Sequence, residues 1–196
     1  WENPYLTLQK EYEATQIKLF GSMALKGYIY RGFKPVHWSP SSQTALAEAE
    51  LEYPEGHTSE SIYVSFPVVE IPENLRNDLI SQGIDLPSTQ KDLEKIIKVV
   101  IWTTTPWTLP ANLAISVNKS LDYAFVKSSE ETILVVAVEL VGAISQKLGV
   151  RFEVLGSCKG AMLSGVRYRH PIMDRISTIV LGGDYINTET GTGLVH

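Results

Sequence analysis

Short runs of β-branched and aromatic residues, separated by turn-forming residues, recur along most of the chain and predict β-strands. These strands are expected at 62–69, 96–100, 113–117, 123–127, 132–136, 152–156 and 176–181. Apolar residues at helical spacing instead predict helices at 10–26 and 140–148, each followed by a glycine that can end it. Many short strands with few helices predict an α+β fold, built as a closed or nearly closed β-barrel with helices outside it.

Two stretches give weaker signals. Residues 45–53 have the composition of a helix, but Glu48, Glu50 and Glu52 alternate with apolar residues, which is the period of a half-buried strand, so a strand is predicted. Residues 72–95 are mixed and charged and contain several helix breakers. They are expected to form a surface excursion with a short helical piece and no functional role.

A polar, turn-rich joint at 54–60 marks a domain boundary. We therefore divide the chain into a segment 1–57, containing a helix and short extended pieces, and a mainly β domain 58–196. The chain begins without methionine and carries no tail after His196. It is expected to be a fragment of a longer protein.

The amino-acid composition limits the classes of protein to which this chain can belong. A hydrophobic content of 44% with 20% charged residues is typical of a soluble globular chain. No apolar run reaches the ~18 residues of a membrane span, and the first residues do not resemble a signal peptide. A net charge of −5 argues against a protein that binds long nucleic acids through contacts with many phosphates. The same charge is compatible with a pocket that binds only the end of a strand.

A single cysteine, Cys158, excludes an internal disulfide and a multi-cysteine metal site. It fits a reducing compartment. We expect Cys158 to be a small buried residue and not a nucleophile. Because the chain also lacks a Gly-x-Ser-x-Gly elbow, a serine or cysteine hydrolase is not favoured.

The most unusual stretch is Trp-Thr-Thr-Thr-Pro-Trp-Thr-Leu-Pro-Ala-Asn at 102–112. Pro106 should end the preceding strand. Because side chains alternate along a strand, Thr103 and Thr105 should share one face and open onto one pocket, with Thr104 pointing the other way. Three threonines alone are equally compatible with good strand residues followed by an aromatic turn.

This stretch resembles the threonine-rich segment of the editing domain inserted in isoleucyl-tRNA synthetases. Valyl and leucyl relatives typically have Arg-Pro where this chain has Pro106-Trp107, which favours the isoleucyl family. Two later strings carry the same resemblance: the one at 159–171, and Gly-Thr-Gly-Leu-Val-His at 191–196. The resemblance makes 1–57 the end of a catalytic-core segment with its connector, and 58–196 an editing domain that is incomplete at its C-terminus.

The resemblance implies an activity. A pocket made for isoleucine rejects valine by only ~1–3 kcal/mol, so a second pocket must hydrolyse the wrong product. The implied reaction is post-transfer editing, the hydrolysis of valine from the 3′ end of the isoleucine tRNA, with pre-transfer editing of valyl-adenylate also possible. The parent enzyme would ligate isoleucine to tRNA with ATP and Mg²⁺. This chain would need no cofactor, and without the family's nucleotide-binding signatures it would not activate an amino acid.

Roles follow for particular residues. Hydrolysis needs a placed water and donors for the developing oxyanion. The groups expected to supply them are Thr103, Thr104, Thr105 and Asn112. Trp102 or Trp107 could stack on the terminal adenine, although either tryptophan could belong to the core. Thr192 and Gly193 are expected to line the pocket, and His196 to narrow it as a size gate. On spacing alone, Gly191 and Gly193 favour a tight turn, although they could also let the backbone approach a ligand.

The resemblance sets further expectations. Relatives often hold zinc with a Cys-x-x-Cys pair where this chain has Ser39 and Ser42, so no metal is expected. The family's acidic ligand for the substrate ammonium follows the histidine at 196, so weak or no editing is expected from this chain alone. A monomer in the bacterial cytoplasm, or in the stroma or matrix of an organelle, is expected. The alternative function is a non-catalytic, β-rich module that binds a nucleotide or peptide.

Overall fold

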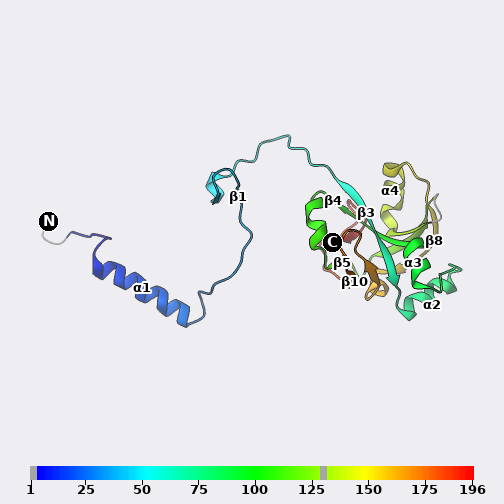
Figure 1. Ribbon diagram of the computed structural model, residues 1–196, viewed down its shortest axis with the longest axis horizontal. Coiled ribbons are helices and arrows are strands. Elements are labelled where there is room, and N and C mark those ends of the chain that lie inside the picture. Colours follow the sequence, from blue (N-terminus) through cyan, green and yellow to red (C-terminus); the bar gives the residue numbers. More distant parts are fainter. Residues whose placement is uncertain (1–3, 129–131) are drawn as a thin grey trace. The chain divides into compact units, whose positions relative to one another are not determined.

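The computed structural model describes residues 4–128 and 132–196. The chain divides into two compact units, Trp1–His57 and Thr58–His196 (Figure 1). Each unit is described by itself below.

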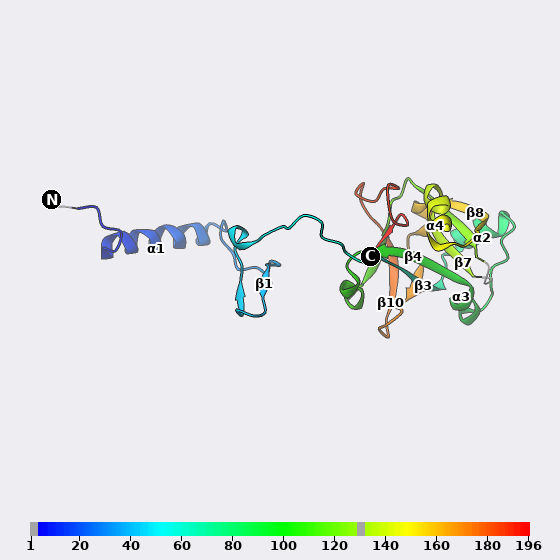
Figure 2. The same ribbon diagram turned by 90° about the horizontal axis from the view of Figure 1, so that it is seen from above.

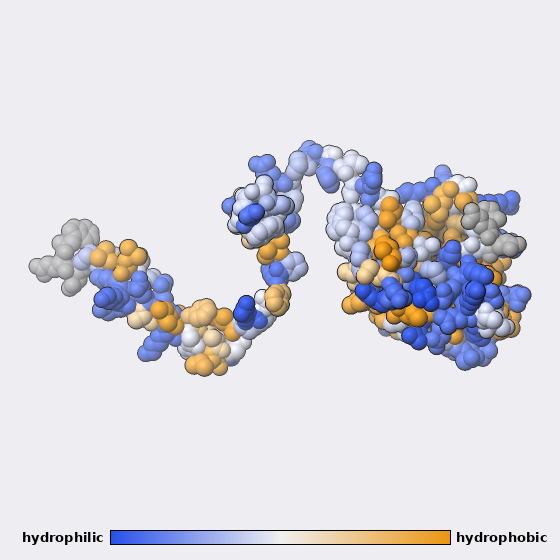
Figure 3. All heavy atoms as spheres, viewed as in Figure 1, coloured by the Kyte–Doolittle hydropathy of each residue, from blue (hydrophilic) through white to orange (hydrophobic). Residues whose placement is uncertain are grey.

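The first unit contains one helix and a small hairpin. Helix α1, Lys10–Leu25, is followed by Gly27 at a positive φ of 76°, a conformation that glycine adopts without steric cost. Strands β1, Trp38–Ser39, and β2, Thr44–Ala45, pair antiparallel. No residue of α1 is buried, and Figure 3 shows apolar side chains on the surface of this unit.

The strand predicted at 45–53 is wrong. After β2 the chain forms only a short 3₁₀ turn, η1, Glu48–Glu50, in which the Glu50 carboxylate accepts a hydrogen bond of 2.7 Å from the Ala47 N–H. Within residues 4–128 and 132–196 no strand pairs with positions 47–53, and an unpaired strand leaves its backbone groups without partners. Local hydrogen bonding therefore decides the conformation.

The second unit is built on a nine-stranded mixed sheet with strand order β11-β5-β10-β9-β3-β4-β7-β6-β8. The strands are β3 (Ile62–Glu70), β4 (Ile97–Thr103), β5 (Ala114–Val117), β6 (Asp122–Lys127), β7 (Ile133–Ala137), β8 (Glu153–Lys159), β9 (Arg167–Arg169), β10 (Ile176–Leu181) and β11 (Leu194–Val195). The β4/β7 and β5/β10 pairs are parallel and the other pairs are antiparallel. Figures 1 and 2 show β3 and β4 running side by side.

The helices of this unit are short. They are α2 (Glu73–Ser81), α3 (Gln90–Ile96), α4 (Val141–Leu148) and α5 (Gly160–Leu163), with 3₁₀ turns η2 (Pro106–Ala111) and η3 (Val138–Leu140). Gly149 ends α4 in the left-handed conformation, as predicted. The excursion at 72–95 contains two helices where one helical piece was expected, because Leu75, Leu79 and Leu93 bury themselves against the sheet.

The core of the second unit lies between the sheet and these helices, with Phe66, Tyr123, Phe125 and Tyr168 among its largest buried side chains. The α+β class is confirmed. Closure into a barrel is not found within the described residues, because β11 and β8 remain at opposite ends of the strand order. Both edge strands are thus unpaired on one side among the residues described.

Candidate functional site

The threonine segment forms a tight turn at the end of β4. Thr103 is the last strand residue, and its hydroxyl lies 3.2 Å from that of Thr105 and accepts a 3.1 Å hydrogen bond from the Thr105 N–H. The Thr103 and Thr105 hydroxyls thus lie on the same side, as predicted. The expected sharing of one pocket is not found, because the cavity described next is lined by Thr103 and Thr104 and not by Thr105. Thr104 is held separately, because the Ser59 hydroxyl donates to its carbonyl at 3.2 Å. The turn is therefore fixed by its own hydroxyls as well as by the sheet.

A cavity of about 330 Å³ joins this turn to the C-terminal end of the chain. Its lining is formed by Trp102, Thr103, Thr104, Tyr185, Ile186, Asn187, Thr190, Gly191, Thr192, Gly193, Leu194 and Val195. Segments about ninety positions apart in the sequence thus share one wall. Five predicted site residues meet here: Trp102, Thr103, Thr104, Thr192 and Gly193.

Two glycines that line this cavity are required for two reasons: the backbone has a positive φ at both, and neighbouring side chains stand close to the place of an added Cβ. Gly191 and Gly193 have φ of 81° and 78°. A Cβ on Gly191 would lie 3.4 Å from the Trp102 ring, and one on Gly193 only 2.5 Å from the Ala137 Cβ. The loop is also bonded to the sheet, since the Ala137 N–H donates to the Thr192 carbonyl at 2.8 Å. The tight turn that the spacing favoured is thus found, and the close approach seen here is to Trp102 and Ala137.

Trp102 presents an unusual environment. Its ring packs against Gly191, and its indole N–H is the single buried side-chain group without a hydrogen-bond partner in the described part of the chain. Trp107 instead is 73% exposed on η2. Of the two tryptophans considered for stacking, Trp107 therefore has the accessible ring.

Four predicted site residues do not line the cavity: Thr105, Trp107, Asn112 and His196. Asn112 is only 5% exposed; its amide donates to the Ala114 carbonyl at 2.8 Å, and its side-chain oxygen accepts from the Tyr168 hydroxyl at 2.7 Å. Nothing in the sequence marks Tyr168 as a partner of Asn112, because Asn112 follows η2, Tyr168 lies 56 positions later in β9, and only the tertiary fold brings them together.

His196 approaches the threonine turn through Thr108, which the sequence analysis did not single out. The Thr108 hydroxyl donates to the Thr105 carbonyl at 2.7 Å and lies 3.4 Å from His196 Nε2. Because the hydroxyl proton is already used, Nε2 is the donor of the second bond. Burial, followed by the nearby His170, lowers the pKa of His196, which favours the neutral ring.

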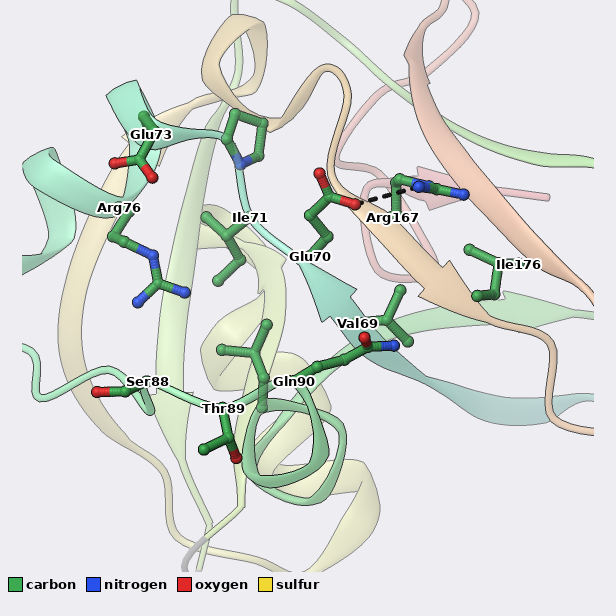
Figure 4. A pocket seen from close by; sticks show the side chains of 12 residues that line it. Val69, Glu70, Ile71, Glu73, Arg76, Ser88, Thr89, Gln90, Arg167 and Ile176 are labelled. Carbon is green, nitrogen blue, oxygen red and sulfur yellow. Dashed lines mark hydrogen bonds and ion pairs between the residues drawn. The ribbon is translucent and has the colours of Figure 1, made fainter.

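Another cavity, of about 460 Å³, lies away from the threonine turn (Figure 4). Arg167 pairs there with Glu70 at 3.2 Å, and Arg76 donates to the Pro87 carbonyl at 3.2 Å. Among the described residues, no predicted site residue lines it, and Glu70, Arg76 and Arg167 already have partners of their own. We therefore do not assign it a ligand.

Other chemistry is limited among the described residues. Cys158 is buried, as predicted; burial first, and then Asp78 and Asp122, raise its pKa to about 12, so it is a thiol at neutral pH. Within 4–128 and 132–196, no group of three or more His, Cys, Asp or Glu side chains is placed to hold a metal ion. In the same ranges no helix has both the length and the hydropathy of a membrane span.

Comparison with known proteins adds the following. Residues 1–156 match the family model described as tRNA synthetases class I (I, L, M and V). The chain is 60% identical to the isoleucine--tRNA ligases of Prochlorococcus marinus (strain MIT 9211) and of Synechococcus sp. (strain CC9311), with all of this chain and 20% of each relative aligned. It thus spans about a fifth of the length of these relatives.

One solved structure with a similar fold is the editing domain of P. falciparum cytosolic leucyl-tRNA synthetase. The TM-score is 0.54 at 13% identity, over 70% of this chain and 60% of that one. At this identity the likeness concerns the fold alone.

Proposed function

The chain belongs to the class I tRNA synthetases (I, L, M and V), and from this premise we propose that its second unit hydrolyses valine from mischarged isoleucine tRNA. The resemblance to isoleucyl-tRNA synthetases noted in the threonine segment is confirmed by the 60% identity over the whole chain. Valyl-adenylate is a second proposed substrate. In a full-length protein this activity would correct the ligation of isoleucine to tRNA with ATP.

The observation that carries the proposal is the shared cavity of the threonine turn and the Gly-Thr-Gly loop. Thr103 and Thr104 supply hydroxyls that both donate and accept, as the placement of a water and a ribose requires. The lining from Gly191 to Val195 contains two glycines and is fixed to the sheet through the Thr192 carbonyl. A preorganised polar cavity of this kind suits attack of water on an activated ester.

Substrate recognition is assigned to two residues near the threonine turn that do not line the cavity, Trp107 and His196. We propose that only the 3′ end of the tRNA enters, which is compatible with a net charge of −5. Trp107 would stack on the terminal adenine, since its ring is accessible. His196, neutral and fixed to Thr108, would limit the size of the aminoacyl side chain.

We propose that the 196-residue chain alone hydrolyses slowly. Among the described residues, none that lines the cavity is acidic, so the substrate ammonium finds no carboxylate partner among them. An uncompensated charge next to a partly desolvated site costs binding energy. We further propose that the protein acts as a monomer in the bacterial cytoplasm, in line with the bacterial relatives.

Deacylation of valyl-tRNA tests this function. The substrate is offered to the 196-residue chain and to the Prochlorococcus marinus isoleucine--tRNA ligase in which this sequence replaces the corresponding fifth, here called the chimera. We expect rapid hydrolysis by the chimera, slow hydrolysis by the chain, and correctly charged isoleucyl-tRNA left intact.

Variants of the chimera separate editing from the alternative of a non-catalytic binding module. Thr105→Ala combined with Asn112→Ala should slow valine release while the ligation of isoleucine continues. A chimera that ligates isoleucine but never releases valine would refute the proposal and favour the binding module. Fast hydrolysis by the short chain would contradict the argument from the missing carboxylate.

A further inference from the structure

Three side chains of the β9–β10 hairpin donate hydrogen bonds to the segment that follows the threonine turn. The Tyr168 hydroxyl donates to Asn112 Oδ1 at 2.7 Å, and Arg175 Nη1 donates to the Asn112 carbonyl at 2.6 Å. His170 Nε2 lies 2.7 Å from the Leu109 carbonyl. Both ends of the segment Leu109–Asn112 are thus hydrogen-bonded to three residues, Tyr168, His170 and Arg175, here called the hairpin brace.

The protonation of His170 can be read from its neighbours. Its Nδ1 accepts from the backbone N–H groups of Ile172 and Met173 at 3.0 and 2.9 Å, so Nδ1 carries no proton. Nε2 therefore carries the proton and donates it to the Leu109 carbonyl. That carbonyl also accepts from the Asn112 N–H at 2.9 Å, which uses both of its lone pairs.

The brace is itself rigid. Tyr168 is 0% exposed, and its ring meets Phe66 edge to face at a centroid distance of 5.2 Å. The ring of His170 meets the same Phe66 at 5.9 Å. Because Phe66 is a buried residue of β3, the brace is fixed to the centre of the sheet.

Hydrogen bonds also connect the segment Leu109–Asn112 to the threonine turn. Turn η2 connects the two, and the Thr108 N–H and hydroxyl both donate to the Thr105 carbonyl, at 3.1 and 2.7 Å. At its other end, Thr103 is the last residue of β4 and pairs with Ile62 of β3. The turn is therefore anchored by the sheet on one side and by the brace on the other.

We propose that Tyr168, His170 and Arg175 are positioning residues that act through Thr108 and Thr105 to hold the threonine turn, and with it Thr103 and Thr104, in the geometry that ester hydrolysis needs. This inference rests on the proposed editing function. It also changes the role of Asn112 from the catalytic one expected from the sequence. Asn112 accepts hydrogen bonds from Tyr168 and Arg175, and in this way it connects the hairpin brace to the threonine turn. None of the three brace residues lines the cavity, so their effect must pass through Leu109 and Asn112.

The hairpin offers a matched control. Arg169 lies between Tyr168 and His170 in sequence, but its guanidinium pairs with Glu94 at 3.0 Å and makes no contact with the brace among the hydrogen bonds of the described residues. Arg169→Gln removes a charged hydrogen bond from the same hairpin. Tyr168→Phe removes only a hydroxyl, and Arg175→Gln only the guanidinium.

The test measures deacylation by the chimera together with amide hydrogen exchange in the 196-residue chain. We expect Tyr168→Phe and Arg175→Gln to lower kcat by roughly 10- to 100-fold with KM little changed, the range typical of a catalytic group displaced by about 1 Å. The amides of Thr108 and Asn112 should exchange faster in both variants. Arg169→Gln should change neither quantity.

Two results would overturn the inference. One is a kcat for Tyr168→Phe equal to that of Arg169→Gln, which would reduce the brace to ordinary stabilisation. The other is unchanged exchange at Thr108 and Asn112. If the unmodified chimera releases no valine, the editing proposal fails separately, and the exchange measurement still decides whether the brace restrains the turn.

Discussion

Replacing Gly193 by alanine tests the wall of the candidate site most directly. Gly193 has a φ of 78°, and a Cβ built on it would stand 2.5 Å from the Cβ of Ala137. Neither atom belongs to a flexible side chain that could move aside. The backbone is also tied at this point, because the Tyr123 hydroxyl donates to the Gly193 carbonyl at 2.7 Å.

The expected cost has two parts. A left-handed conformation costs a non-glycine residue ~1–2 kcal/mol. Forcing an extra methyl group into a packed site costs about 1–3 kcal/mol. The free energy of unfolding of Gly193→Ala should therefore fall by roughly 2–5 kcal/mol.

Urea unfolding of the 196-residue chain, followed by tryptophan fluorescence, measures this difference. Gly142→Ala is the matched control, because Gly142 lies in α4 with nothing within 4 Å of the added Cβ. That variant should be stabilised by ~0.5–1 kcal/mol, since alanine has less conformational freedom to lose in a helix. The two substitutions are chemically identical and should differ in sign.

A loss below about 1 kcal/mol for Gly193→Ala would refute the reasoning, since it is less than the backbone cost alone. It would mean that the Gly-Thr-Gly loop does not pack on Ala137. In the chimera, Gly193→Ala should also slow valine release, because the loop forms one wall of the cavity.

Three further predictions concern titratable groups. The Cys158 thiol, with a pKa raised to about 12, should resist iodoacetamide in the native chain near pH 8 and react once urea unfolds it. The pKa of His196 is lowered, so the ring is protonated only at pH values below the ordinary histidine pKa of about 6.5. Valine release by the chimera should therefore decline only in that acidic range. His196→Gln should remove the decline. Burial raises the pKa of Tyr168 to about 12. The protonated Tyr168 hydroxyl therefore contributes fully to the stability of the fold below about pH 10, and this contribution is lost as the pH rises toward 12. Tyr168→Phe should flatten that part of the curve of urea-measured stability against pH.

Local features of the fold could be predicted from the sequence because their causes are local. Runs of β-branched and aromatic residues located the strands around Val64, Val99 and Phe125, and Gly149 ended α4 where the helical spacing stopped. The prediction at 45–53 was wrong for the opposite reason. Alternation describes a strand only if a neighbour is available to pair with it, and the sequence does not say which neighbours exist.

The sequence by itself determined the chemistry that was on offer: hydroxyls at Thr103 and Thr105 on one face, glycines at 191 and 193, and a family resemblance carried by both strings. Only the tertiary structure decided which of these groups share a cavity. It brought Trp102 against Gly191, left Trp107 exposed, and buried Asn112 beneath Tyr168. Strand pairing between distant segments sets these neighbours, and a pairing is a property of two segments that neither one encodes alone.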